Sequence, residues 1–164
     1  MLHEIQATCS AHWIGLHPYP APDAWTAIDD SEQRTLAALC ELYAYHGTVE
    51  LMLANVRRDA QLLPALRAAM AGAGTHFAAV EKTLDAGWDG DAVRRRAALA
   101  LALDFATWQQ LTQRLSDDDA AALMTRMVAC AQRERRAPQA ARVRTAPSPA
   151  RAAMSSTTCC AACA

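Results

Sequence analysis

The chain has 164 residues, 52% of them hydrophobic, and a net charge of −1. Alanine accounts for 39 residues, whereas Trp, Tyr and Phe together contribute nine, and this composition favours closely packed helices because alanine is the best helix former and is depleted from strands. The six glycines have no period and the six cysteines are dilute, which excludes a collagen and a disulfide-stapled miniprotein.

The longest apolar run covers residues 97–103 and is far shorter than the roughly 18 to 20 residues needed to cross a bilayer. The first five residues include no basic side chain and no continuous apolar stretch, so they do not resemble a secretion signal. We therefore expect a cytoplasmic protein with reduced thiols and no membrane partner.

The first predicted helix covers residues 2–16, because its apolar side chains recur every three or four positions. These side chains are Leu2, Ile5, Cys9, Trp13 and Leu16. The prolines at positions 18, 20 and 22 end this helix, since proline lacks the N–H donor. A short helical turn over residues 23–28 then brings Trp25 and Ile28 to the core.

A long helix follows, with Asp30 or Ser31 as its N-cap and a kink predicted at His46–Gly47. It closes near Arg57 and Arg58, whose charges suit a helix C-terminus. Pro64 predicts the first turn of the next helix, which extends to about Gly87.

Residues 92–115 predict a single helix that is apolar on more than one face. Ser116 and the three aspartates after it are typical of an N-cap and open the last helix. Beyond Gln132 the periodicity ends, and prolines with six arginines predict a disordered tail over residues 133–164. The sequence thus predicts one all-α helical bundle over residues 1–132.

Nucleotide-binding and catalytic motifs are absent from the sequence, so we expect no enzyme and no cofactor. Cys9 and His12, joined by His17 and His46, are the only metal-ligand hypothesis, and a buried cysteine beside a core histidine explains the pair better. Cys160 and Cys163 have CxxC spacing but lack the helix N-terminus of a redox motif.

Aromatic side chains, Tyr45 among them, are spread over four predicted helices and lie within a helical turn of polar residues. This mixture is typical of a small-molecule site, although a place in the core is the favoured interpretation for each aromatic residue taken singly. The predicted ligand-binding residues are His12, Trp13, Tyr43, His46, Asn55, Phe77, Phe105 and Trp108.

Five stretches together resemble the C-terminal regulatory domain of TetR-family transcriptional regulators. They are residues 7–13, 42–45, 52–59, 102–108 and 115–121. The resemblance covers residues 2–131 in element order. It implies a homodimer that binds a small apolar effector inside a helical bundle and pairs through its last two helices.

Carried onto this sequence, the resemblance implies dimer helices over residues 92–115 and 116–131. The implied interface residues are Ala97, Leu101, Phe105, Leu123 and Met127. TetR-family regulators carry a helix-turn-helix domain ahead of this region, and residues 1–16 contain no counterpart of it. We therefore expect contact with DNA only through such a domain, whether its absence reflects truncation, a misassigned start codon or a stand-alone sensor.

Two other functions fit the same residues. One is an interaction protein that forms heterodimers with full-length TetR-like subunits through the same two helices. The other is a metal- or thiol-dependent enzyme built on Cys9 and His12. The sequence does not identify the effector, the operator, the regulated genes or a role for the tail cysteines.

Overall fold

A computed structural model describes residues 15–133, and every regular element in that range is a helix. The elements are a short 3-10 helix, η1 (Pro22–Trp25), and the α-helices α2 (Ser31–Ala60), α3 (Pro64–Asp85), α4 (Ala92–Leu103), α5 (Phe105–Thr112) and α6 (Asp117–Arg133). The all-α prediction is confirmed. Most of the helix predicted over residues 2–16, and the tail from residue 134 on, lie outside the described residues.

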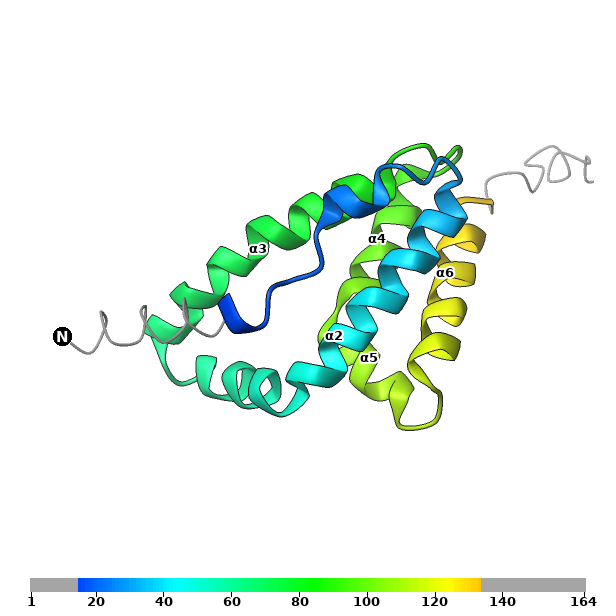
Figure 1. The fold of residues 1–164 in the computed structure, drawn as a ribbon. Coiled ribbons are helices and arrows are strands. Elements are labelled where there is room, and N and C mark those ends of the chain that lie inside the picture. Colours follow the sequence, from blue (N-terminus) through cyan, green and yellow to red (C-terminus); the bar gives the residue numbers. More distant parts are fainter. Residues whose placement is uncertain (1–14, 134–164) are drawn as a thin grey trace, which may run out of the picture.

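Helices α2, α3, α4 and α6 form a closed ring of contacts (Figure 1). Both α2 and α4 pack against α3 and α6, while η1 lies against α2 and α3. In Figure 1, α3 approaches α4 at its C-terminal end and lies apart from α4 and α6 towards its N-terminal end, where a short turn joins it to the end of α2. Large buried side chains from each helix of the ring fill its interior, including Leu39, Leu42, Leu84, Leu99, Met124 and Val128.

Side-chain caps confirm three of the predicted helix starts. The Asp30 carboxylate accepts a hydrogen bond from the Gln33 N–H at 2.7 Å, and the Ser116 hydroxyl accepts one from the Asp119 N–H at 3.1 Å. Asp91 caps α4 in the same way. Each cap satisfies a backbone donor that has no partner within the helix.

Helix α2 is one continuous helix through His46 and Gly47, the position of the predicted kink. A Cβ atom at Gly47 would lie 3.7 Å from Asp117 Oδ2, an ordinary van der Waals distance. Arg57 lies in the last turn of α2, and Pro64 begins α3, both as predicted. None of the helices within residues 15–133 combines the length and the apolarity that crossing a bilayer requires.

The single helix predicted over residues 92–115 is wrong, because Asp104 divides it into α4 and α5. Asp104 has extended backbone angles, φ −78° and ψ 128°, and its carboxylate accepts a hydrogen bond from the Thr107 N–H at 3.0 Å. Its own N–H donates to the Leu101 carbonyl at 3.3 Å. The Tyr43 hydroxyl donates to the Ala102 carbonyl at 2.9 Å, so a side chain of α2 satisfies an acceptor freed by the break. An apolar pattern alone does not reveal that a mid-helix aspartate acts as a cap.

The loop between α3 and α4 brings the start of α4 to the end of α6. Gly90 has φ +98°, and a Cβ atom there would lie 2.7 Å from the backbone oxygen of Gln132. The Asp91 N–H donates to that same oxygen at 3.4 Å. Helices α4 and α6 are therefore antiparallel neighbours.

We expect Asp104→Ala to lower the free energy of unfolding by about 1–2 kcal/mol, because it removes the cap of α5 and the partner of Arg57. Asp104→Asn keeps an oxygen that can cap α5, so its cost should be about 0.5 kcal/mol. Urea unfolding followed by circular dichroism measures both. The matched control is Asp59→Ala, which removes an exposed ion pair with Arg58 and should change stability by less than about 0.5 kcal/mol. Equal costs for Asp104→Ala and Asp59→Ala would contradict the capping role.

Candidate functional site

Four of the eight predicted ligand-binding residues meet where α2 faces α5. We call Tyr43, His46, Phe105 and Trp108 the His46 cluster. The His46 ring lies 5.3 Å from the Phe105 ring and 5.4 Å from the Trp108 ring, both edge to face. It stacks on Tyr43 at 6.2 Å, and Phe105 and Trp108 lie 5.3 Å apart. All four side chains are buried.

The break at Asp104 positions the α5 half of this cluster. It starts a new helix at Phe105, and the Trp108 indole N–H donates to Asp117 Oδ1 at 2.9 Å. That bond ties α5 to the first turn of α6. The orientation of Trp108 thus depends on both ends of α5.

His46 is 1% exposed, and its Nδ1 atom has no hydrogen-bond partner among the described residues. Burial lowers the pKa of His46 to about 4; Arg57 adds to this effect, whereas Asp104 and Asp117 oppose it. The imidazole is therefore neutral at neutral pH. A neutral ring with an unsatisfied polar atom in an aromatic environment suits an uncharged ligand better than an ionic one.

Arg57 forms one edge of the His46 cluster. Its two terminal nitrogens each lie 3.2 Å from Asp104 Oδ1, and its guanidinium carbon lies 5.7 Å from the centre of the Phe105 ring. The pair is about two-fifths exposed, so it contributes little to stability. The charged groups of Arg57 and Asp104 therefore lie at the surface, whereas the rings of the His46 cluster are buried.

A second aromatic group contains the predicted residue Phe77. We call Tyr19, Tyr45, His76 and Phe77 the Tyr19 cluster. The Tyr19 ring stacks on His76 at 4.8 Å and lies 5.3 Å from Tyr45 and 5.8 Å from Phe77. Tyr45 also lies 6.2 Å from the His46 ring, so the two clusters adjoin.

The other predicted ligand residues do not join these clusters in the described structure. Asn55 is exposed on α2, and His12 and Trp13 lie outside the described residues. Sequence reasoning missed Tyr19 and His76. Tyr19 lies in the proline-rich segment, where the pattern indicates only the end of a helix, whereas the pairing of His76 with Phe77 on α3 is a signal that the sequence does contain.

The predicted dimer residues divide into two groups. Ala97, Leu101 and Met127 are exposed and Leu123 is half-buried, so all four are accessible. Phe105 is only 4% exposed, and its assignment to a dimer interface is wrong. The break at Asp104 directs the Phe105 ring to the His46 cluster instead.

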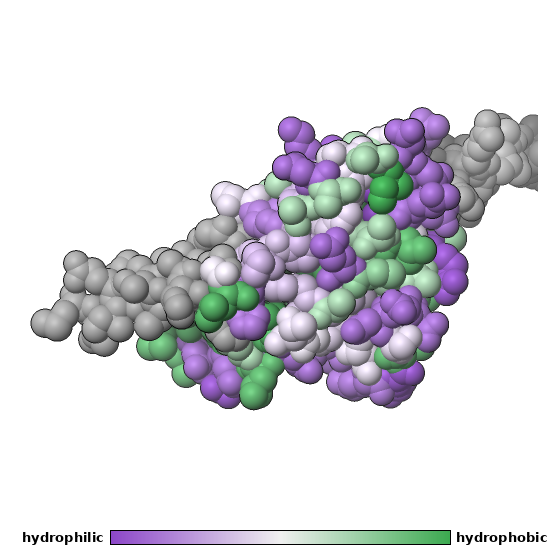
Figure 2. All heavy atoms as spheres, viewed as in Figure 1, coloured by the Kyte–Doolittle hydropathy of each residue, from purple (hydrophilic) through white to green (hydrophobic). Residues whose placement is uncertain are grey.

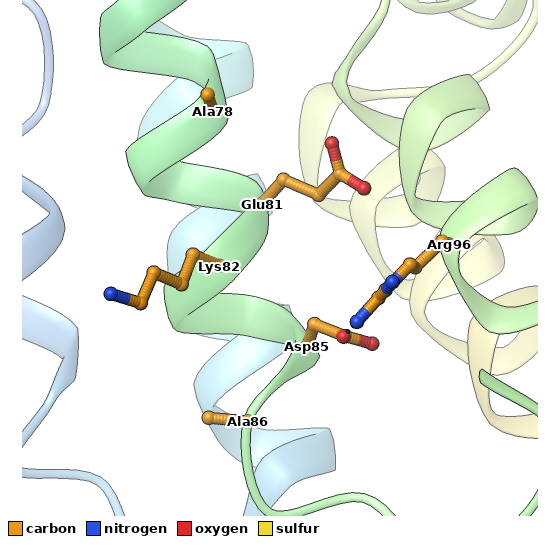
Figure 3. Close-up of a pocket in the computed structure, with 6 residues that line it drawn as sticks. All are labelled: Ala78, Glu81, Lys82, Asp85, Ala86 and Arg96. Carbon is orange, nitrogen blue, oxygen red and sulfur yellow. Dashed lines mark hydrogen bonds and ion pairs between the residues drawn. The ribbon is translucent and has the colours of Figure 1, made fainter.

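An open pocket of about 290 Å³ lies between α3 and α4 (Figure 3). Figure 3 shows Glu81, Asp85 and Arg96 pointing towards one another, with Lys82 directed away. Asp85 accepts hydrogen bonds from Arg95 Nε at 2.6 Å and from Arg96 Nε at 2.8 Å. Four of the six lining residues are charged, and Asp85 and Arg96 pair with each other, so the pocket lacks the predominantly apolar lining typical of a small-molecule site.

Within residues 15–133 no three His, Cys, Asp or Glu side chains are grouped closely enough to hold a metal ion. Cys9 and His12, on which the metal hypothesis depends, lie outside that range. Comparison with protein-family models, curated proteins and solved structures finds no match to this chain.

The low pKa of His46 predicts that acid destabilises the fold. Between pH 6.5, the ordinary value, and about 4, the unfolded chain binds a proton at this residue and the folded chain does not. Unfolding free energy should thus fall as pH falls through this window, by up to about 3 kcal/mol for this residue. Burial also lowers the pKa of His76, which adds a contribution of the same sign.

Urea unfolding between about pH 7 and about pH 4.5 measures this dependence. His46→Phe should remove most of it, because phenylalanine keeps a ring in the cluster and takes up no proton. His17→Gln is the control and should keep the wild-type dependence, since it leaves His46 in place. An unchanged slope in His46→Phe would show that His46 is not the responsible group.

Proposed function

We propose that this chain is the effector-binding and dimerisation domain of a TetR-like transcriptional regulator and is not an enzyme. The small effector would bind at the aromatic clusters. Two copies would associate through the outer faces of α4 and α6. DNA would be contacted only by a helix-turn-helix domain of the kind found in that family.

The observation that carries this proposal is the position of α5. This eight-residue helix supplies Phe105 and Trp108 to the His46 cluster and connects α4 directly to α6. A ligand that moved either ring would therefore act on both helices of the proposed interface. Allosteric regulation requires such a physical link between two sites.

Exposed apolar side chains on α4 and α6 support the dimer. Val93 is 75% exposed, Leu101 54% and Met127 46%. Because α4 and α6 are antiparallel, Ala97 and Leu101 lie at about the levels of Met127 and Leu123. Apolar side chains at matching levels of two neighbouring helices fit a four-helix interface between two copies.

Figure 2 shows one face of the molecule. Its hydrophobic residues form small groups that hydrophilic residues separate. Scattered apolar side chains of this kind are normal on a protein surface and mark no interface.

Sedimentation velocity at micromolar concentration tests the dimer. The wild-type chain should sediment at twice its mass of 17.7 kDa. Leu101→Asp and Met127→Asp should each weaken association at least about tenfold, because each would bury an unpaired charge at the interface. Leu62→Asp, at a position 80% exposed in the turn between α2 and α3, should leave the dimer intact.

A wild-type chain that sediments as a monomer would overturn the dimer. So would equal behaviour of Leu101→Asp and Leu62→Asp. Circular dichroism of each variant separates loss of association from loss of folding. Phe105 is unsuitable for this test, since a charge at that buried position would unfold the domain.

A further inference from the structure

Three side chains on two helices enclose the ring of Tyr19. Tyr45 comes from α2, and His76 and Phe77 come from α3. We call these three residues the aromatic cradle. The Tyr19 ring is nearly parallel to His76, with 24° between their planes, and meets Phe77 edge to face at 72°. Stacked and edge-to-face contacts of this kind recognise a flat ring.

Tyr19 leaves one polar atom of the cradle unsatisfied. His76 Nε2 is buried and has no hydrogen-bond partner among the described residues. Burial raises the pKa of Tyr19 and of Tyr45. The Tyr45 hydroxyl donates to the His17 carbonyl, at 3.3 Å. The Tyr19 ring therefore makes the stacking contacts of the cradle but does not reach its free imidazole nitrogen.

The chain around Tyr19 is not part of a helix. Pro18 and Pro20 flank it, and neither has an N–H with which to join a helical ladder. On the C-terminal side the segment is held at Trp25, which is 3% exposed and donates to Glu41 Oε2 at 2.8 Å. Removal of the Tyr19 ring from the cradle would thus leave every helix of the ring of contacts intact.

We propose that the aromatic cradle binds an uncharged planar aromatic compound with a polar group at its edge, and that this compound replaces the ring of Tyr19. The inference rests on the proposed function and names the chemical class of its effector. Such a compound makes the ring contacts of Tyr19 and adds a hydrogen bond to His76 Nε2. Tyr45 then connects the occupied cradle to the His46 cluster.

The test uses p-cresol, which is the tyrosine side chain as a free molecule, and toluene, which lacks the hydroxyl. Isothermal titration calorimetry on the full chain measures both affinities, and circular dichroism follows the melting temperature. We expect p-cresol to bind the wild-type chain about tenfold more tightly than toluene, because only p-cresol can hydrogen-bond to His76.

Variants at two positions separate stacking from hydrogen bonding. Tyr19→Ala removes the competing ring and should bind p-cresol at least about tenfold more tightly than wild type, whereas Tyr19→Phe keeps a ring and should change the affinity less than about threefold. His76→Phe keeps the stacking surface and loses the nitrogen. It should reduce the preference for p-cresol over toluene to less than about threefold. His76→Phe also keeps the proposal testable if Tyr19→Ala fails to fold.

The outcomes distinguish failure of the cradle from failure of the proposed function. Affinities for p-cresol that neither Tyr19→Ala nor His76→Phe changes would place the ligand elsewhere, which overturns the cradle and leaves effector binding standing. Binding of 1-heptanol without p-cresol, or of tetramethylammonium without p-cresol, would overturn the aromatic class. Binding of none of these probes at millimolar concentration would overturn both the cradle and the effector-binding part of the proposed function, while the sedimentation test would still decide the dimer.

Discussion

The rest of the structure depends on the cap that Asp104 places in the middle of an apolar stretch. The carboxylate satisfies the first turn of α5, and the extended backbone of Asp104 ends α4. That break frees the Ala102 carbonyl for Tyr43 and turns Phe105 and Trp108 towards His46. One polar side chain thus determines where α4 ends and α5 begins, and which aromatic rings meet.

Local signals made much of the fold predictable. Asp30, Pro64 and Ser116 have roles that a few neighbouring residues determine, so the sequence places them correctly. Asp104 is different, because the same residue serves as an exposed helical position or as a cap depending on tertiary contacts. Its partner Arg57 lies 47 residues before it, and the Tyr43 hydroxyl that bonds to the freed Ala102 carbonyl comes from the same distant helix. Periodicity over a short window contains no information about such distant partners.

The sequence also predicted only part of the candidate site. The sequence identified His46, Phe105 and Trp108 as aromatic and polar neighbours, and the structure brings them together. It could not assign Phe105 to one of two proposed roles, since helical periodicity does not say which face a second helix covers. Tyr19 was not predicted as a site residue, because a proline-rich segment indicates only a connection between helices. In the structure this connection places the Tyr19 ring against side chains of α2 and α3.

Gly90 shows that exposure and tolerance to substitution are different properties. The residue is exposed and belongs to neither aromatic cluster, so a survey of accessible positions would mark it as freely variable. Its φ is positive, and the Gln132 oxygen would lie only 2.7 Å from any Cβ atom at this position, so there is room for hydrogen alone. Natural variants of this domain should therefore retain glycine here. Retention of glycine in this loop would reflect the close contact between the start of α4 and the end of α6, and would not indicate a ligand or a partner.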